Sequence, residues 1–286
     1  MKIIVNSGNI GTPVAVELAK RGVDVGLAVR TPKPNPTWDA LGIRQVPFDI
    51  ANVPLMTEAL RGADAFFSLT PLVENFTQAG TNAVRAAKAA GVPKIVRSSA
   101  QGAGPEAGIR LGRIHYSVEK AIEESGIPFT VLRPANFMQN FLMFGIPGTI
   151  QSQNAFYSAQ GEAKVSAIDT RDVSAAAVRV LLEPGHEGKR YELTGGESLS
   201  NGEIAALFST ALGRKISHVS IPDAAVREAM AKGGVPPWLV DLLSQLNAVA
   251  AAGYLSEVKP DAALLLGRSP TTFAQFIGDH LATFKA

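Results

Sequence analysis

The sequence predicts an α/β protein built on a doubly wound parallel sheet, with a smaller lobe toward its C-terminal end. Three observations favour this class. The first thirty residues contain an apolar run, a turn of small residues, a helical pattern and a second apolar run. Short apolar runs then alternate with helical segments, the order typical of parallel sheets with right-handed crossovers. This alternation stops near residue 135, so we expect one domain over 1–134 and a lobe over 135–286, with 163–184 returning to the first domain.

The first thirty residues are interpreted as a strand, a helix and a second strand. The apolar runs 2–5 and 23–29 are the strands, and apolar residues recur at helical spacing between them. The turn before such a helix presents backbone N–H groups that can hold a pyrophosphate. Such turns usually carry three glycines, but the first position here is Val5, so that glycine is either replaced or the turn is shorter. Unless this is an ordinary turn of a parallel α/β protein, its cofactor-binding residues are Ser7, Gly8, Asn9, Ile10 and Gly11.

Further strands and helices follow in alternation, and 31–36 and 101–108 are predicted loops. The predicted strands are 43–48, 65–69, 94–99 and 129–132, and the predicted helices are 53–60, 76–90 and 114–124. In such sheets the ligand binds outside the carboxyl ends of the strands. The residues at these ends are therefore expected to surround one cleft: Arg30, Asp49, Thr70, Ser98, Ser99, Pro134 and Asn136.

The C-terminal half has a different pattern and is predicted to form a lobe that covers this cleft. Segment 145–161 is rich in turn residues. Asp172 is a suitable N-cap for a helix over 173–182. Short strands are predicted at 165–168 and 191–193, and helices at 200–212, 223–232 and 237–252.

Composition excludes several classes of protein. Apolar residues make up 46% of the chain and the net charge is +2 without a basic block, so we expect a globular core and no nucleic-acid partner. The absence of cysteine excludes disulfides, thiolate metal sites and a cysteine nucleophile. No apolar stretch approaches the roughly 18 residues that span a membrane, and no leader pattern is recognised, so a cytoplasmic protein is expected. No metal is expected, because four histidines are scattered without ligand spacing: His115, His186, His218 and His280.

The end of the second strand bears on the choice of cofactor. Sites for NADH usually have an acidic residue there, which binds the ribose 2′-hydroxyl. Here the strand ends at Arg30, and Lys33 is near in the sequence. A guanidinium suits a phosphate and stacks on adenine, so Arg30 is predicted to bind the 2′-phosphate of NADPH. The alternative is a solvated arginine at a strand end.

Tyr116 and Lys120 form a Tyr-x-x-x-Lys pair in the predicted helix after the fifth strand. Residues four apart share one helix face, so both side chains can reach one cleft. A nearby lysine lowers the pKa of a phenol, which can then exchange a proton with a substrate. A hydroxyl of Ser98 or Ser99 could stabilise the developing charge. The alternative is that Tyr116 packs against the lobe and Lys120 is solvated.

Several side chains after the sixth strand are candidates for substrate binding. Phe137 and Phe141 are core residues by default, but they could also form the apolar wall that a flat aromatic substrate needs. Trp238 stands at a helix start after two prolines, where it is either a packing anchor or a pocket residue. His186 lies in a glycine-flanked loop and is interpreted as structural.

An ordered set of motifs along nearly the whole chain resembles the NmrA-like family, an atypical branch of the short-chain dehydrogenase/reductases. Its flavin-free reductases of quinones, triphenylmethane dyes and azo dyes are the most similar members. The motifs are the early glycine turn, His115-x-x-x-Glu119-Lys120, residues 127–134, Thr170-Arg171-Asp172, residues 185–189 and residues 267–272.

The resemblance implies a Rossmann domain that binds NADPH and a C-terminal lobe that makes the substrate pocket. By position, the glycines of the turn would face the pyrophosphate and Arg30 the 2′-phosphate, with Thr70 and Ser98 along the cofactor. Lys120 would touch the nicotinamide ribose, and Pro134 and Asn136 would lie near the nicotinamide. Tyr116 matches the better-known dehydrogenases, whereas relatives in this group often have an apolar residue there.

Two functions from different classes follow from this resemblance. The first is an NADPH-dependent reductase, with NADH possible, that passes hydride to a small aromatic electron acceptor without flavin or metal. The second is a regulatory protein that senses NADP(H) without turnover and acts through a partner protein. The sequence makes no prediction about oligomeric state.

Overall fold

The computed structural model describes residues 1–285, and the chain forms two compact units. Unit 1 consists of residues 1–107, 112–134 and 171–192. Unit 2 consists of residues 108–111 and 135–170 together with the chain from Leu193 onward. Unit 1 therefore contains a segment, 171–192, that follows a long excursion of the chain into unit 2.

Unit 1 is built around a seven-stranded sheet with the order β3-β2-β1-β4-β5-β6-β9. Adjacent strands from β3 to β6 pair in parallel. The strand order reverses between β1 and β4, which is where doubly wound sheets bind their ligands. The predicted fold class is confirmed. The strands are β1 (Lys2–Asn6), β2 (Asp24–Val29), β3 (Arg44–Pro47), β4 (Ala65–Ser68), β5 (Ile95–Ser98), β6 (Phe129–Pro134) and β9 (Arg190–Leu193).

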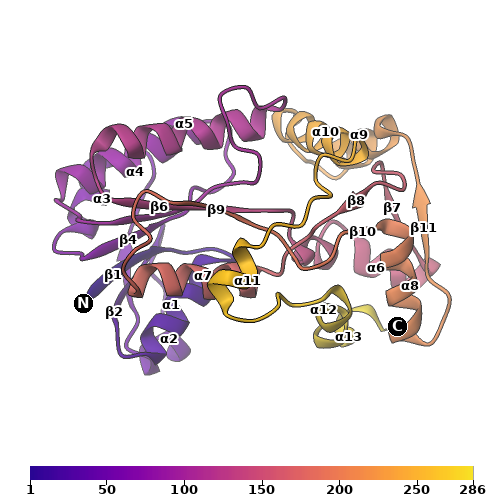
Figure 1. The fold of residues 1–286 in the computed structure, drawn as a ribbon, viewed down its shortest axis with the longest axis horizontal. Helices are drawn as coiled ribbons and strands as arrows, with labels where there is room; N and C mark the ends of the chain where they lie inside the picture. The colour runs from indigo at the N-terminus through magenta and orange to yellow at the C-terminus, as the bar shows by residue number, and fades with distance from the viewer. Residues whose placement is uncertain (286) are drawn as a thin grey trace. The chain divides into compact units, whose positions relative to one another are not determined.

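Helices cover both faces of this sheet (Figure 1). One face carries α3 (Val53–Leu60), α4 (Phe76–Ala89) and α5 (Arg110–Ser125), and the other carries α1 (Gly11–Lys20) and α7 (Thr170–Leu182). A buried apolar cluster joins the strands to the first group of helices, with Phe66 and Ile95 from the sheet and Met56, Val84 and Val118 from the helices. The strands read as continuous apolar runs because both of their faces are covered.

Most bounds in unit 1 lie within one residue of the sequence prediction, and four elements differ by more. β6 continues through Arg133 to Pro134, because proline is tolerated at a strand end. α5 begins at Arg110, four residues early. α7 begins at Thr170, so Asp172 lies in the first helical turn and is not the N-cap. Asn35 caps a short helix, α2 (Pro36–Ala40), by accepting from the Trp38 N–H, where we predicted only a loop as far as Pro36.

Unit 2 is mostly helical, with two small sheets of the order β10-β8 and β11-β7. Its core is a cluster of phenylalanines that includes Phe156, Phe208 and Phe273. Its elements are η1 (Met138–Leu142), α6 (Ile146–Gln153), β7 (Ala155–Ser158), β8 (Lys164–Val165), β10 (Leu199–Ser200), α8 (Asn201–Leu212), β11 (Ser217–Ser220), α9 (Asp223–Lys232), α10 (Pro237–Ala251), α11 (Asp261–Leu266), α12 (Phe273–Asp279) and α13 (Leu281–Phe284).

The sequence predicted the long helices of unit 2 better than its short elements. α9 has the predicted bounds, and α8 begins one residue late because Ser200 is its N-cap in a capping box with Glu203. The turn-rich segment 145–161 contains α6 and β7, which were not predicted. The strand expected at 165–168 is wrong: β8 ends at Val165, and Ile168 forms only an isolated bridge with Phe137.

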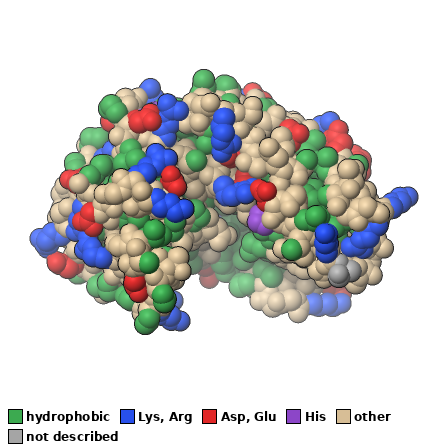
Figure 2. All heavy atoms as spheres, turned by 90° about the horizontal axis from the view of Figure 1, so that it is seen from below, with side chains coloured by type: hydrophobic (Ala, Val, Ile, Leu, Met, Phe, Trp, Pro, Cys, Tyr) green, Lys and Arg blue, Asp and Glu red, His purple; other side chains and the backbone are tan. Residues whose placement is uncertain are grey.

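The surface carries both charges. Basic and acidic side chains are interspersed on the face shown in Figure 2. Within residues 1–285 no helix is both long and apolar enough to cross a membrane. Across the same residues, no group of three or more His, Cys, Asp or Glu side chains could hold a metal ion.

Candidate functional site

The turn between β1 and α1 lies at the carboxyl end of β1, beside the reversal of strand order. It runs from Ser7 to Ile10, and Gly8 has a φ of +142°, which only glycine adopts readily. The Ser7 N–H donates to the Ala28 carbonyl oxygen at 3.0 Å and so fixes the turn on β2. Ile10 is the N-cap of α1 and has no side chain that could accept from the first helical N–H groups. Such N–H groups attract an anion.

Gly11 has a packing role that the sequence did not predict. A Cβ atom at this position would lie 1.7 Å from the carbonyl oxygen of Asn6, so α1 can start this close to β1 only with glycine. We expected Gly11 to allow the approach of a phosphate. The close approach that the structure contains is between helix and strand, which is the task of the last glycine in dinucleotide-binding turns.

Asn6 is a candidate site residue that was not predicted from the sequence. Its side chain is buried at the end of β1, where Oδ1 accepts from the Leu69 N–H at 3.1 Å. This bond joins the ends of β1 and β4 at the reversal of strand order. Because Oδ1 is the acceptor, Nδ2 supplies the donors, and it donates to no other atom within residues 1–285. The available signal was a polar residue directly after the apolar run.

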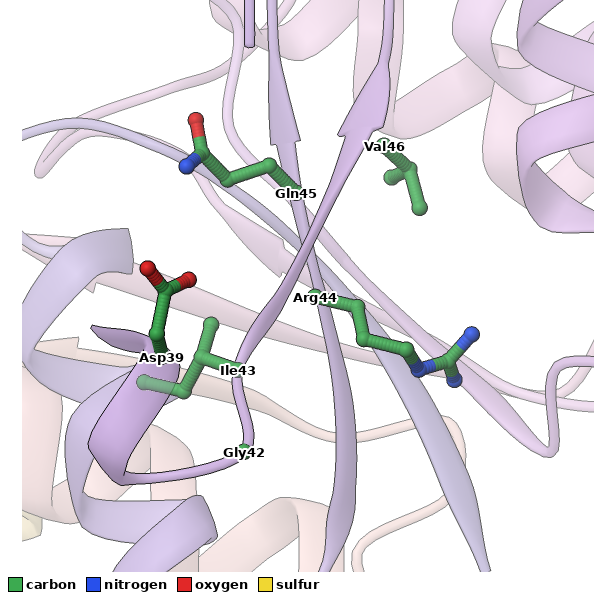
Figure 3. A pocket seen from close by; sticks show the side chains of 6 residues that line it. All are labelled: Asp39, Gly42, Ile43, Arg44, Gln45 and Val46. Carbon is green, nitrogen blue, oxygen red and sulfur yellow. The ribbon is translucent and has the colours of Figure 1, made fainter. Parts of the chain in front are cut away.

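Arg30 and Lys33 lie at the end of β2, and both are exposed. Arg30 makes no hydrogen bond or ion pair with the other described residues, so its guanidinium is available. The loop at Lys33 is held through its backbone, because the Lys33 N–H donates to Gln45 Oε1 at 2.9 Å and its carbonyl accepts from the same side chain. Figure 3 shows Gln45 beside a shallow hollow at β3. None of the predicted cofactor residues lines this hollow.

Asp49 follows β3 and forms a turn with its own backbone. Its Oδ1 accepts from the Ala51 N–H at 3.0 Å. The next residue is fixed from α4, where Asn82 Nδ2 donates to the Ile50 carbonyl oxygen at 3.0 Å. The third strand end therefore has a defined conformation, supported by a buried asparagine that the sequence analysis did not name.

The ends of β4 and β5 carry Thr70, Ser98 and Ser99. Thr70 is partly buried, and its Oγ1 accepts from Arg97 Nη1 at 2.8 Å. Ser98 is the last residue of β5 and is buried. Ser99 donates to Oε1 of Glu119 at 2.5 Å. The structure therefore brings Thr70 and Ser98 to the same edge as the glycine turn, because their strands are parallel and in register.

Helix α5 has two different faces. Glu119 has no exposed side-chain surface, and besides Ser99 it accepts from Arg133 through both oxygens, at 3.0 and 2.7 Å. Lys120 is about half exposed, and its Nζ lies 3.5 Å from Glu123 and 4.0 Å from Glu124. These contacts agree with the alternative left open above, a solvated lysine. Tyr116 is partly buried and makes no hydrogen bond with the described residues.

The remaining predicted residues belong to unit 2, apart from Pro134, which ends β6 in unit 1. The Asn136 carbonyl oxygen accepts from the Ile168 N–H at 2.8 Å, and Phe137 forms a bridge with Ile168. Phe141 packs edge-to-face on Phe156 and Phe273, so its ring is part of the phenylalanine core. Trp238 is the second residue of α10 and is partly buried.

The strand-end edge, defined here as residues 6–11, Arg30, Asp49, Thr70 and Ser98, fits a dinucleotide. Its turn presents N–H groups, and Asn6 and Arg30 have free donors. The close contact of Gly11 with Asn6 keeps the start of α1 at the strand end, where a pyrophosphate can lie. Nothing in this set of donors favours a metal ion, which prefers carboxylate or imidazole ligands.

Comparisons with known proteins agree with this geometry. The model of the NmrA-like family matches residues 1–277. NAD(P)H azoreductase of Xenophilus azovorans is 35% identical over 284 residues, which cover 99% of this chain and 99% of that protein. NADPH-dependent quinone oxidoreductase of Escherichia coli, in complex with NADPH, has a TM-score of 0.88 at 28% identity, covering 99% of this chain and 100% of that chain. Nmra, a negative transcriptional regulator in complex with NAD, has a TM-score of 0.77 at 19% identity, covering 97% and 94%, and shares the fold alone.

Proposed function

Because the chain belongs to the NmrA-like family, we propose that it is an NAD(P)H-dependent oxidoreductase that reduces a quinone, an azo dye or a similar conjugated aromatic electrophile. The observation that supports this most is the strand-end edge of unit 1, which offers free donors for a dinucleotide. An azoreductase that is similar over its full length supports the same class of reaction. NADPH, when bound, supplies the hydride, and no flavin is part of the proposal.

The chain's own residues would bind the cofactor in three places. The N–H groups at the start of α1 and the amide of Asn6 would hold the diphosphate. Arg30 would bind the 2′-phosphate in a charge-assisted contact, which favours NADPH over NADH. Asp49 and Lys33 would lie near the adenosine, and Thr70 and Ser98 would orient the rest of the dinucleotide.

The acceptor would bind to residues that follow β6. Pro134 ends that strand, and Asn136 and Phe137 come next in the chain. Aromatic side chains such as Phe137, Phe141 and Trp238 would suit a flat acceptor. Since the ring of Phe141 already packs in the core, we expect Phe137 and Trp238 to contribute more to binding of the acceptor. Tyr116 remains the candidate proton donor, with Lys120 as its proposed partner.

The decisive experiment follows nicotinamide absorbance after the purified protein is mixed with NADPH and a panel of quinones and azo dyes. We expect protein-dependent oxidation of NADPH without added flavin, and slower oxidation of NADH. Heat-denatured protein is the control for direct reaction between NADPH and the acceptors. No oxidation with any acceptor would contradict the proposal, and activity only after addition of a flavin would contradict its flavin-free part.

A regulatory protein that binds NADP(H) without turnover is the second candidate. The solvated position of Lys120 favours it, because the predicted proton-transfer pair then lacks its lysine in the site. The same measurement separates the two candidates when it is combined with titration of NADPH fluorescence. Tight binding without oxidation across the panel would favour the regulator.

A further inference from the structure

Arg97 is the least expected side chain in unit 1, because a charged side chain here has no exposed surface. Its Nη1 donates to Oγ1 of Thr70 at 2.8 Å and, more weakly, to the Ser68 carbonyl oxygen at 3.4 Å. Its Nε and Nη2 have no hydrogen-bond partner among residues 1–285. Burying a charged group with so few partners costs free energy. A side chain with this cost calls for a functional explanation.

Among residues 1–285, no carboxylate neutralises Arg97 by contact. Burial lowers its pKa to about 10 against the opposing attraction of Glu119, so the guanidinium is charged at neutral pH. The oxygens of Glu119 are engaged by Ser99 and Arg133 instead. The guanidinium carbon lies 5.6 Å from the centre of the Phe76 ring, which is a weak partner for a cation. A positive charge therefore remains beneath the end of β4.

This charge restricts the hydroxyl of Thr70. A hydroxyl has one hydrogen to donate, and its oxygen accepts from others. Because Arg97 donates to Oγ1, the hydrogen of Thr70 must point away from Arg97, and no described residue accepts it. Thr70 directly follows Leu69, whose N–H is held by Asn6, so the segment is fixed on the strand-end edge.

We propose that Arg97 is a positioning residue, which fixes Thr70 as a hydrogen-bond donor to an anionic oxygen of the bound dinucleotide. The buried cation donates to Oγ1 and polarises the hydroxyl. The hydroxyl therefore donates more strongly to a negatively charged acceptor on the side of Oγ1 opposite Arg97. The inference rests on the proposed function, since it assumes a dinucleotide at this edge. It adds a residue that contacts neither cofactor nor acceptor and acts only through Thr70.

The test measures NADPH affinity by fluorescence and stability by thermal unfolding in Arg97→Met, Arg97→Lys, Thr70→Val and the double variant Arg97→Met/Thr70→Val. Replacing a buried charge by an apolar side chain of similar volume is often neutral or stabilising, so we expect an unchanged or higher Tm for Arg97→Met. We expect its affinity for NADPH to fall about 10-fold. A loss of this size corresponds to about one hydrogen bond to a charged group, here the bond from Thr70. Arg97→Lys should recover part of this loss.

The double variant tests whether Arg97 acts through Thr70. If it does, the double variant should bind NADPH no more weakly than the weaker single variant, because both remove the same contact. Lys94→Met is the matched control. Lys94 is a cation at the other end of β5, where Nζ donates to the Val180 carbonyl oxygen at 2.7 Å, so its loss should leave NADPH affinity unchanged.

The outcomes separate this inference from the proposed function. Unchanged affinity in Arg97→Met, or losses that add in the double variant, would overturn the role of Arg97. If Arg97→Met does not fold, Arg97→Lys decides, because it keeps the cation: an affinity as low as that of Thr70→Val overturns the inference, and an affinity above that of Thr70→Val supports it. Wild-type protein that binds NADPH but oxidises none with any acceptor overturns the reductase proposal alone, and failure to bind NADPH overturns both.

Discussion

The two halves of the strand-end edge are built in different ways. The β1–α1 turn consists of backbone, and its close approach to β1 depends on one missing side chain, at Gly11. The ends of β4 and β5 are instead held by buried polar side chains, in which Asn6 bonds Leu69, Arg97 bonds Thr70 and Glu119 bonds Ser99. At Gly11 this turn has no room for an added atom. A side-chain network should tolerate substitutions without unfolding, but each substitution should change the charge distribution at the strand ends.

The largest effect is expected at the turn, for Gly11→Ala. The new Cβ would lie 1.7 Å from the Asn6 carbonyl oxygen, so α1 must move away from β1. Overpacking of this kind typically costs about 1–3 kcal/mol, and more where the obstacle is backbone, so we expect at least ~3 kcal/mol in the free energy of unfolding. Affinity for NADPH and NADH should fall together, by more than about 10-fold, because the helix N-terminus is displaced. Denaturant unfolding and fluorescence titration measure both quantities.

Gly104→Ala is the matched control for this prediction. Gly104 lies in the loop after β5 with open space around its Cα, so an added Cβ meets nothing within 4 Å. We expect little change in either measurement for this variant. A Gly11→Ala protein as stable and as tightly binding as wild type would show that the turn is adaptable, and the contrast between the two halves would disappear.

The contrast also explains what the sequence could and could not predict. A glycine turn after an apolar run is a local pattern, so the βαβ unit, the parallel sheet and the long helices were predicted from neighbouring residues. The partners in the network are distant in the chain: Asn6 and Leu69 are 63 residues apart. No local pattern pairs such residues, so Asn6 and Arg97 were missed. In unit 2, short strands such as β7 and β11 depend on pairing between segments about 60 residues apart, which a single strand does not reveal.

The second prediction concerns the pH dependence of stability and His115, whose ring lies 4.5 Å from that of Phe76, between centroids. Burial, and next the positive charge of Arg97, lower the pKa of His115 to about 3 in the folded protein. The unfolded chain binds the proton near pH 6.5, so stability is complete above that pH and is lost as the pH falls toward 3. The loss is on the order of 1.4 kcal/mol per pH unit, or about 2 kcal/mol between pH 7 and 5.

The comparison with His115→Leu isolates this contribution. The pKa values of His186 and His218 are also lowered by burial, but both residues are unchanged in the variant, so the difference in slope reports on His115. We expect the free energy of unfolding of His115→Leu to change less between pH 7 and 5 than that of wild type. Equal slopes would mean that His115 is protonated as easily in the folded protein as in the unfolded one, and that Arg97 does not affect it.

The third prediction concerns Arg30, the exposed member of the strand-end edge, which follows β2. Its guanidinium is exposed and has no partner among the described residues, so its removal should not affect folding. A charge-assisted contact with the 2′-phosphate is worth roughly 1.5–3 kcal/mol, so Arg30→Ala should weaken NADPH binding about 10- to 150-fold and leave NADH unchanged. Lys33→Ala is the control, with a smaller effect, because its loop is held by backbone bonds to Gln45. Equal losses for both cofactors would reject the phosphate assignment.

The smallest effects are expected on the outer face of α5, and they decide between the two interpretations of the Tyr-x-x-x-Lys pair. The helix contributes Glu119 to the buried network, whereas Lys120 lies about half exposed beside Glu123 and Glu124. An exposed ion pair contributes little to stability, on the order of 0.5 kcal/mol or less. If Lys120 has only this role, it contacts neither cofactor nor acceptor, and Lys120→Ala should change kcat and the KM for NADPH by less than about 2-fold.

Tyr116→Phe removes only a hydroxyl without a partner among the described residues, and a quinone or azo group can take its proton from water. We therefore expect at most about a 10-fold loss of kcat, at the low end for general acid catalysis. A Lys120→Ala enzyme with raised KM and lowered kcat would instead show that the lysine reaches the cofactor during turnover, and the predicted catalytic pair would stand.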